Sequence, residues 1–198
     1  ETIEKAMYRA RKDEKRGVVH SYDMLGEAAR TEADAEKYFQ AYLSALDALS
    51  TSSADNALSV KLSALDPRFE PARRAELIDP SSKLIQRVTD ICLRAADGGI
   101  EVTIDAEEAS RLELQLDILA IMSHTMKKLR PDWDELGLAV QAYQKRAVAV
   151  IDWLAHLSRR DERQLRVRLV KGAYWDTEIK LAQLAGLASF PVFTRKEA

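Results

Sequence analysis

The sequence is poor in several features that mark whole classes of protein. Its 198 residues include one cysteine, Cys92, which excludes an internal disulfide framework and fits a reducing compartment. No apolar run approaches the ~20 residues that cross a bilayer, and the first residues lack the apolar core of a signal peptide. The 30 basic and 32 acidic residues leave a net charge of −2, which indicates no broad surface for nucleic acid or anionic membrane. These absences predict a cytoplasmic protein that selects its ligand locally.

Two common ligand motifs are missing as well. None of the seven glycines lies two positions from another, so the Gly-x-Gly-x-x-Gly fingerprint of Rossmann folds is absent. His20, His124 and His156 occur on unrelated segments, without a cysteine or carboxylate at ligand spacing. We therefore expect no metal site. Cys92 lies on the apolar side of a helical pattern and is expected in the core.

Strand-like runs and amphipathic helical patterns alternate along the chain. Hydrophobic residues make up 46% and charged residues 31% of the sequence, which is typical of a globular domain. Alternation of strand and helix predicts an α/β fold with a parallel sheet. The expected strands cover 18–22, 58–62, 101–105, 138–142 and 166–170. The expected helices cover 33–49, 83–96, 112–128 and 147–158, with a further helix from about 175 to 186.

Four of these strands carry a polar side chain near the carboxyl end. Strands in a parallel sheet covered on both faces are normally continuous apolar runs, and alternation sends neighbouring side chains to opposite faces. The polar residues therefore share the second face, which in a (βα)₈ barrel is the interior where such enzymes build their sites. Two alternatives stay open: the residues pair with one another as a polar plug, or the register of some strands is shifted by one. The four residues are Lys61, Asp105, Gln141 and Arg168.

A second candidate site follows the last expected strand. Tyr174 and Trp175 open a helix directly after Lys171 and Gly172. Backbone N–H groups at that helix start, beside a lysine, suit a phosphate, and the two aromatic rings suit a flat ring system. The alternative is that the two aromatic residues pack against a neighbouring element.

Ordered motifs then place the sequence in a known family. The chain resembles the proline dehydrogenase domain of bacterial proline utilization A, a bifunctional proline and pyrroline-5-carboxylate dehydrogenase. The resemblance extends over essentially the whole chain. Its motifs are SYDMLGEA at 21–28, VKLSAL at 60–65, IDAEE at 104–108, QAYQKR at 141–146, RLVKGAYWD at 168–176 and FPVFTRK at 190–196.

The resemblance implies a FAD-dependent (βα)₈ TIM barrel that oxidises L-proline to Δ1-pyrroline-5-carboxylate, the first step of proline catabolism. Electrons would pass to a quinone at the membrane, so the cytoplasmic protein would be peripheral to the inner membrane when reduced. About five βα units of the barrel are expected over 18–198, after a helical arm over 1–17. The remainder would belong to a longer polypeptide with an NAD-dependent aldehyde dehydrogenase domain. We expect no nucleic-acid binding through this segment and no activity from it in isolation.

The resemblance also implies roles for individual residues. Lys61 is expected to hold the proline carboxylate, Asp105 to act as an acid in its hydrogen-bond network and contact the cofactor, and Arg168 to hydrogen-bond the flavin near its reactive nitrogen. Glu27 resembles a gate residue that pairs with an arginine. The remaining substrate-binding positions are Leu169, Ala173 and Tyr174. The remaining cofactor-binding positions are Gln141 at the isoalloxazine edge, Val170, Lys171, Gly172, Ala173 and Trp175 along the cofactor, and Thr194 and Lys196 at the adenylate end.

General physical chemistry favours the same roles. Removing a hydride from the carbon beside the ring nitrogen leaves positive charge on the substrate and negative charge on the flavin, so a cation such as Arg168 near the flavin would stabilise the product. Lys61 would hold the carboxylate in position. Two other hypotheses remain: a non-catalytic fragment or assembly module of a larger barrel protein, and a barrel enzyme whose substrate carries a phosphate.

Overall fold

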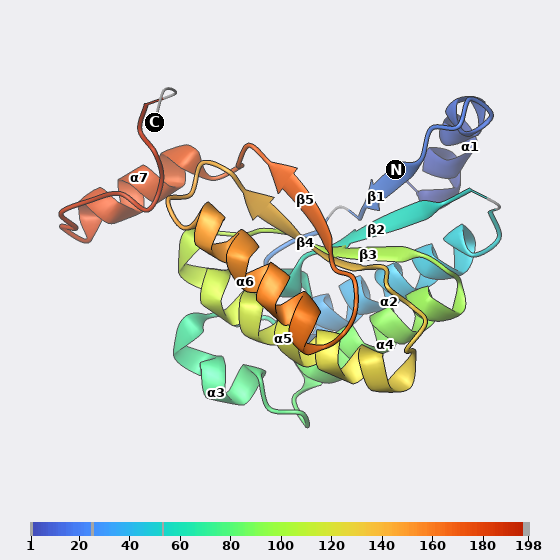
Figure 1. Ribbon diagram of the computed structural model, residues 1–198, viewed down its shortest axis with the longest axis horizontal. Coiled ribbons are helices and arrows are strands. Elements are labelled where there is room, and N and C mark those ends of the chain that lie inside the picture. Colours follow the sequence, from blue (N-terminus) through green and yellow to red (C-terminus); the bar gives the residue numbers. More distant parts are fainter. Residues whose placement is uncertain (1, 25, 53, 196–198) are drawn as a thin grey trace.

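A computed structural model describes the chain except residues 1, 25, 53 and 196–198 (Figure 1). The strands are β1 His20–Asp23, β2 Asn56–Val60, β3 Glu101–Ile104, β4 Leu136–Gln141 and β5 Arg166–Val170. The α-helices are α1 Ile3–Glu14, α2 Glu32–Leu49, α3 Arg74–Leu77, α4 Lys83–Asp97, α5 Leu112–Leu129, α6 Ala147–Arg160 and α7 Trp175–Leu184. Three short 3₁₀ turns cover Leu62–Ala64, Pro71–Arg73 and Ala109–Arg111.

The five strands form one parallel sheet in the order β1-β2-β3-β4-β5. This confirms the predicted sequential parallel sheet, and the observed helices agree with the expected ones to within a few residues. The first strand differs from its prediction, because pairing with β2 begins at His20, while Val18 and Val19 are exposed. The fold is a curled α/β half-barrel.

Helices α2, α4, α5 and α6 cover one face of the sheet (Figure 1). The strand residues that point toward them are aliphatic and almost completely inaccessible to solvent. This apolar burial is the main favourable contribution to folding. The residues that form the layer include Leu58, Val60, Val102, Ile104, Leu136 and Leu138.

Cys92 on α4 lies in this same core, as its place on the apolar helix face predicts. Burial raises the pKa of the Cys92 thiol to about 12, so it stays protonated at neutral pH. A buried, protonated thiol behaves as a small hydrophobic side chain. Cys92 is therefore a packing residue.

Helix α2 begins at a reciprocal cap. The Thr31 hydroxyl accepts a hydrogen bond from the Asp34 backbone N–H at 3.1 Å, and the Asp34 carboxylate accepts one from the Thr31 N–H at 2.9 Å. The pair satisfies two backbone donors that a helix start otherwise leaves without partners.

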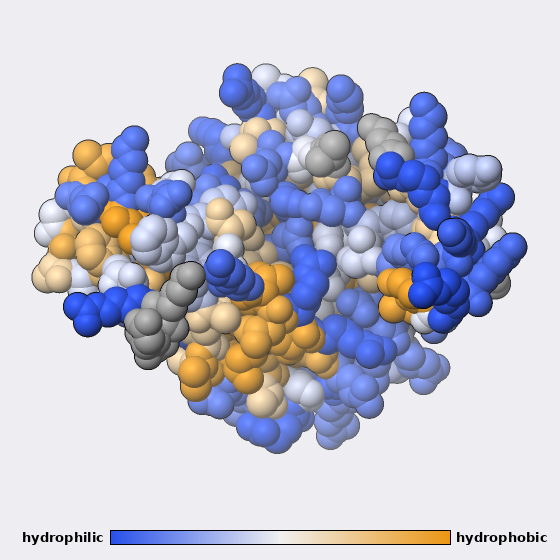
Figure 2. Space-filling view, turned by 90° about the horizontal axis from the view of Figure 1, so that it is seen from above, coloured by the Kyte–Doolittle hydropathy of each residue, from blue (hydrophilic) through white to orange (hydrophobic). Residues whose placement is uncertain are grey.

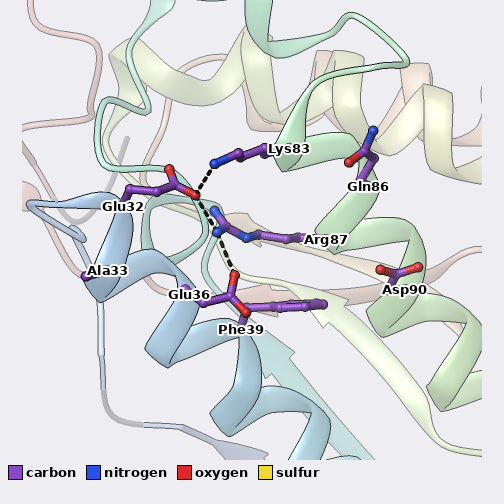
Figure 3. Close-up of a pocket in the computed structure, with 8 residues that line it drawn as sticks. All are labelled: Glu32, Ala33, Glu36, Phe39, Lys83, Gln86, Arg87 and Asp90. Carbon is purple, nitrogen blue, oxygen red and sulfur yellow. Dashed lines mark hydrogen bonds and ion pairs between the residues drawn. The ribbon is translucent and has the colours of Figure 1, made fainter.

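An ion cluster joins α2 to α4 on the outside of the molecule (Figure 3). Arg87 is 6% exposed and donates to Glu32 at 2.6 Å, to Glu36 at 2.9 Å and to the Leu65 carbonyl at 2.9 Å. Its guanidinium also lies over the ring of Phe39. The hollow beside it holds about 440 Å³. Arg87 therefore links α4, on which it lies, to α2 and to the loop after β2.

The segment after α7 folds back onto the loop that follows β4. Gln144 and Val192 form an antiparallel bridge, and the Phe193 N–H donates to the Tyr143 carbonyl at 2.8 Å. This return places the last described residues at the carboxyl ends of β4 and β5. In the described part of the chain, no helix combines the length and apolar character needed to span a membrane.

Candidate active site

The uncovered face of the sheet is polar. The Cα pairing from β2 through β5 runs along Val60, Ile104, Leu138 and Val167 on the helix-covered face. Lys61, Asp105 and Arg168 each follow one of these residues, so alternation places all three on the opposite, concave face. Viewed from that side, the surface is largely hydrophilic across its middle, with separate hydrophobic patches beside it (Figure 2).

Three of the four predicted polar residues form one ion cluster. Lys61 Nζ lies 2.9 Å from Asp105 Oδ2 and 2.9 Å from each carboxylate oxygen of Asp23. The guanidinium of Arg168 pairs with the other oxygen of Asp105. It also reaches across the curled sheet to the hydroxyl of Ser59 on β2, at 2.6 Å. The cluster thus ties β5 to β1, β2 and β3, and its two cations balance its two carboxylates.

The cluster keeps Lys61 protonated. Its side chain is 15% exposed, and this burial by itself lowers the pKa of Lys61. The hydrogen bonds and charges of Asp23 and Asp105 outweigh that effect and raise the pKa above its ordinary value. A fixed cation on the concave face can therefore hold an anionic group of a ligand at any physiological pH.

Gln141 lies on the same face but outside the ion cluster. Its amide nitrogen donates to the Glu107 carbonyl at 2.9 Å, and its amide oxygen accepts from the Ala173 N–H at 3.0 Å. The side chain is 2% exposed. Gln141 therefore joins the loop after β3 to the loop after β5.

A cavity of about 630 Å³ opens past the carboxyl ends of β4 and β5. Its volume falls in the range of about 300–1,000 Å³ that small-molecule sites occupy. Three aromatic rings, two cations and a glycine line it. Aromatic rings suit a flat heterocycle, and the cations suit phosphate groups. The lining residues are Ala142, Tyr143, Lys171, Gly172, Trp175, Phe193, Thr194 and Arg195.

Gly172 fixes the shape of this cavity. Its φ of +131° lies in a region that L side chains rarely adopt, and a Cβ here would lie 1.6 Å from the ring of Tyr143. The Tyr143 hydroxyl in turn accepts from the Tyr174 N–H at 3.2 Å, and the Trp175 indole donates to the Phe193 carbonyl at 2.9 Å. These contacts hold the aromatic wall in place.

The remaining predicted site residues do not all lie on the concave face. Tyr174 is half-buried, and burial, with the charge of Glu27 as the next cause, raises its pKa to about 12. Val170 shares the face of Arg168, since it pairs with Gln141. Leu169 points to the opposite face and is 65% exposed, so the structure does not bring it to the cluster. Lys196 lies outside the described residues.

Two acidic residues of this region, Asp23 and Glu107, were not among those predicted from the sequence. Asp23 continues the polar alternation that begins at Ser21, and the same period would have revealed it had the first strand been placed two residues later. Glu107 is 3% exposed and lies in an irregular segment after β3. No sequence period marks that position.

The fold and this face define a class of protein: a half-barrel of βα units whose charged interior face lies at the carboxyl ends of its strands, where βα-barrel enzymes bind their ligands. Comparison with known proteins gives the family. The proline dehydrogenase family profile matches residues 6–198. The chain belongs to the proline dehydrogenase family, as the sequence motifs predict.

Individual relatives agree with this assignment. The chain is 45% identical to the bifunctional protein PutA of Klebsiella aerogenes over 99% of its length, and 46% identical to that of Rhizobium meliloti over 99%. It spans only 15% and 16% of those two proteins. It superimposes on proline utilization A of Bradyrhizobium japonicum with a TM-score of 0.83 and 50% identity, covering 89% of this chain and 18% of that one. It superimposes on proline utilization A of Bdellovibrio bacteriovorus with a TM-score of 0.87 and 25% identity, covering 99% of this chain and 22% of that one.

Proposed function

We propose that the protein of which this chain forms part oxidises L-proline to Δ1-pyrroline-5-carboxylate with FAD as cofactor. The observation that carries the proposal is the balanced cluster of Asp23, Lys61, Asp105 and Arg168 beside the aromatic cavity, in a member of the proline dehydrogenase family. A zwitterionic amino acid needs a cation and carboxylates in one small site, and this cluster supplies both.

The residues of the cavity fit a flavin dinucleotide. Tyr143 and Trp175 offer flat apolar surfaces, Lys171 and Arg195 offer charge for phosphates, and the missing side chain of Gly172 lets the Tyr143 ring pack against the backbone. These residues, with Gln141, Val170, Ala173 and Thr194, would hold the cofactor. When bound, FAD accepts the hydride that leaves the substrate.

The ion cluster binds and orients the substrate. Lys61 holds the proline carboxylate through a charge-assisted hydrogen bond. Asp105 accepts hydrogen bonds from both Lys61 and Arg168, and so keeps the two cations apart in a fixed arrangement. The carboxylates of Asp23 and Asp105 would offset the positive charge that develops at the ring nitrogen of proline. Arg168 would offset the negative charge that the flavin gains. Tyr174 forms a pocket wall and Glu27 acts at the entrance, whereas the side chain of Leu169 lies on the other face of β5.

The same proposal includes the wider context of the reaction. Electrons pass to a quinone at the membrane, to which the otherwise cytoplasmic protein binds peripherally when reduced. The relatives that this chain matches over almost all of its length are bifunctional proteins several times longer. We therefore place this chain in a longer polypeptide with an NAD-dependent aldehyde dehydrogenase domain, and we expect the isolated 198 residues to be inactive.

The proposal is tested by the colour of the purified full-length polypeptide. It should be yellow, and anaerobic L-proline should bleach the flavin absorbance. Arg168→Met should slow bleaching by about 10²-fold or more, the size of effect seen when one charge-stabilising group is removed. Arg166→Met is the matched control. It removes a cation from the same face of β5, where Arg166 pairs with Glu135 at 2.7 Å, without touching the cluster.

Two results would contradict the proposal. A colourless polypeptide that binds no added FAD would remove the cofactor from the account. Equal bleaching rates for wild type, Arg168→Met and Arg166→Met would remove the ion cluster. The isolated chain provides a further arm, because proline-dependent bleaching there would contradict its expected inactivity.

A further inference from the structure

Glu107 is a buried carboxylate to which the proposed chemistry gives no task. It is 3% exposed. Oε1 accepts a hydrogen bond from the Ser63 N–H at 3.0 Å, and Oε2 accepts one from Arg111 Nη1 at 2.7 Å. Burial raises the pKa of Glu107, against the opposing effect of its bonds to Ser63 and Arg111. A carboxylate buried in this way is costly unless its bonds serve the structure around it.

From Ser63 the hydrogen bonds continue to the loop after β1. The Ser63 hydroxyl accepts from the Ala28 N–H at 3.1 Å, and its carbonyl accepts from the Ala29 N–H at 2.9 Å. Ala28 has a φ of +52°, an unfavourable conformation for alanine that needs such contacts to persist. These two bonds fix the loop segment that carries Glu27.

From Glu107 the bonds also run in the other direction. The Glu107 carbonyl accepts from the Gln141 amide, whose oxygen accepts from the Ala173 N–H. Ser63, Glu107 and Gln141 are each no more than 3% exposed. One continuous set of hydrogen bonds, which we term the rim belt (Ala28, Ala29, Ser63, Glu107, Gln141 and Ala173), therefore connects the carboxyl ends of all five strands, and it is buried in its middle at Ser63, Glu107 and Gln141.

We propose that Glu107 is the central positioning residue of the rim belt. Its carboxylate joins the irregular segment after β3 to the loop after β2 through Ser63 and to the following 3₁₀ turn through Arg111, and these two bonds keep its own carbonyl aimed at Gln141. Loss of one anchor should loosen the loops on both sides, including the segment of Glu27 and the segment of Ala173. The consequence for proline binding rests on the proposed function, whereas the coupling between loops does not.

Amide hydrogen exchange of the full-length polypeptide tests the coupling without any activity. Glu107→Gln keeps the shape of the side chain but loses one of two acceptor oxygens, so one anchor must break. The expected result is exchange at least about tenfold faster in segments 61–65 and 171–175, because local opening exposes their amides. Glu108→Gln is the matched control, since it removes the neighbouring charge, which also pairs with Arg111 at 3.1 Å, and leaves the belt intact.

Kinetics on the same variants test the consequence. Glu107→Gln should raise the KM for proline about tenfold or more and alter the visible flavin spectrum, because small displacements of positioning groups have large effects. Glu108→Gln should do neither. If Glu107→Gln fails to fold, Glu107→Asp serves instead: it keeps the charge but is one methylene too short to reach both partners.

Each outcome decides the question. Faster exchange confined to 61–65, with 171–175 unchanged, would overturn the coupling. Equal exchange in Glu107→Gln and Glu108→Gln would overturn the central position of Glu107. Wild-type polypeptide that proline does not bleach would contradict the proposed function alone, and the exchange experiment would still decide the role of Glu107.

Discussion

The two faces of the sheet are built from the same strands and obey different physics. Toward the helices, Leu58 and Ile104 are completely buried among other aliphatic side chains. Toward the concave side, Asp105 and Arg168 form an ion cluster. Apolar burial is strongly favourable, whereas removing charges from water offsets much of what their pairing returns. The helix-covered face therefore supplies most of the stability, and the concave face is the one that we propose binds the substrate.

The largest effect on stability is expected at Leu58. Leu58→Ala should reduce the free energy of unfolding by about 2–5 kcal/mol, because it removes buried methyl groups and leaves a cavity. Leu169→Ala is the control, since Leu169 on β5 points to the same face of the sheet as Leu58 but is 65% exposed. Its expected change is within about 0.5 kcal/mol. Denaturant unfolding measures both, and equal losses would break the comparison.

The next effect is expected at the edge of the cavity. Gly172→Ala should cost about 1–3 kcal/mol, because its Cβ would overlap the Tyr143 ring at 1.6 Å and its φ of +131° disfavours alanine. Gly186→Ala meets no atom within 4 Å and has a φ of +63°. Gly186→Ala should therefore lower the free energy of unfolding by about 1 kcal/mol, the cost of placing alanine in a left-handed backbone conformation. Thermal unfolding ranks the two, and a larger loss at Gly186 would contradict the close packing of the cavity wall.

A smaller effect is expected at the start of α2. Thr31→Ala removes the cap and should cost about 0.5–2 kcal/mol. Thr31→Ser keeps the hydroxyl and should restore nearly all of that loss. If calorimetry finds the serine and alanine variants equally destabilised, the hydroxyl is not what stabilises the helix start.

The smallest effect concerns pH. The pKa of Lys61 is raised in the folded state by Asp23 and Asp105, against the lowering effect of burial. A raised pKa stabilises the fold fully below the unfolded value of about 10.4, and that contribution is lost as pH rises through the folded pKa. The stability difference between wild type and Lys61→Met should therefore be constant from about pH 6 to 9 and shrink only in more alkaline solution. A difference that changes near neutrality would show that Lys61 is not the fixed cation described above.

Much of the fold could be predicted because it depends on local periods. Alternation of strand and helix predicts the parallel sheet, and alternation within strands places Lys61, Asp105 and Arg168 on one face. Some residues were not predicted because a local pattern placed a strand boundary wrongly. Val18 and Val19 resemble strand residues but precede the paired segment, and this shift hid Asp23.

The remaining part of the site depends on contacts between distant segments. Glu107 bonds to Ser63 across 44 positions of sequence and to Gln141 across 34. Neither bond follows from a helix or strand period, so the rim belt could not be read from the sequence. The pocket role expected for Leu169 came from the family resemblance, and strand alternation places that side chain on the other face. That role stays a prediction.

Lys61→Met in the full-length polypeptide tests the division between the two faces most directly, if stability and proline affinity are measured on the same sample. Asp105 keeps its pair with Arg168, and the side chain of Asp23 is 52% exposed to water, so little uncompensated charge is buried. The free energy of unfolding should fall by no more than about 1 kcal/mol, while loss of the charge-assisted bond should weaken proline binding about tenfold or more. A stability loss as large as that of Leu58→Ala, with proline affinity unchanged, would contradict the account.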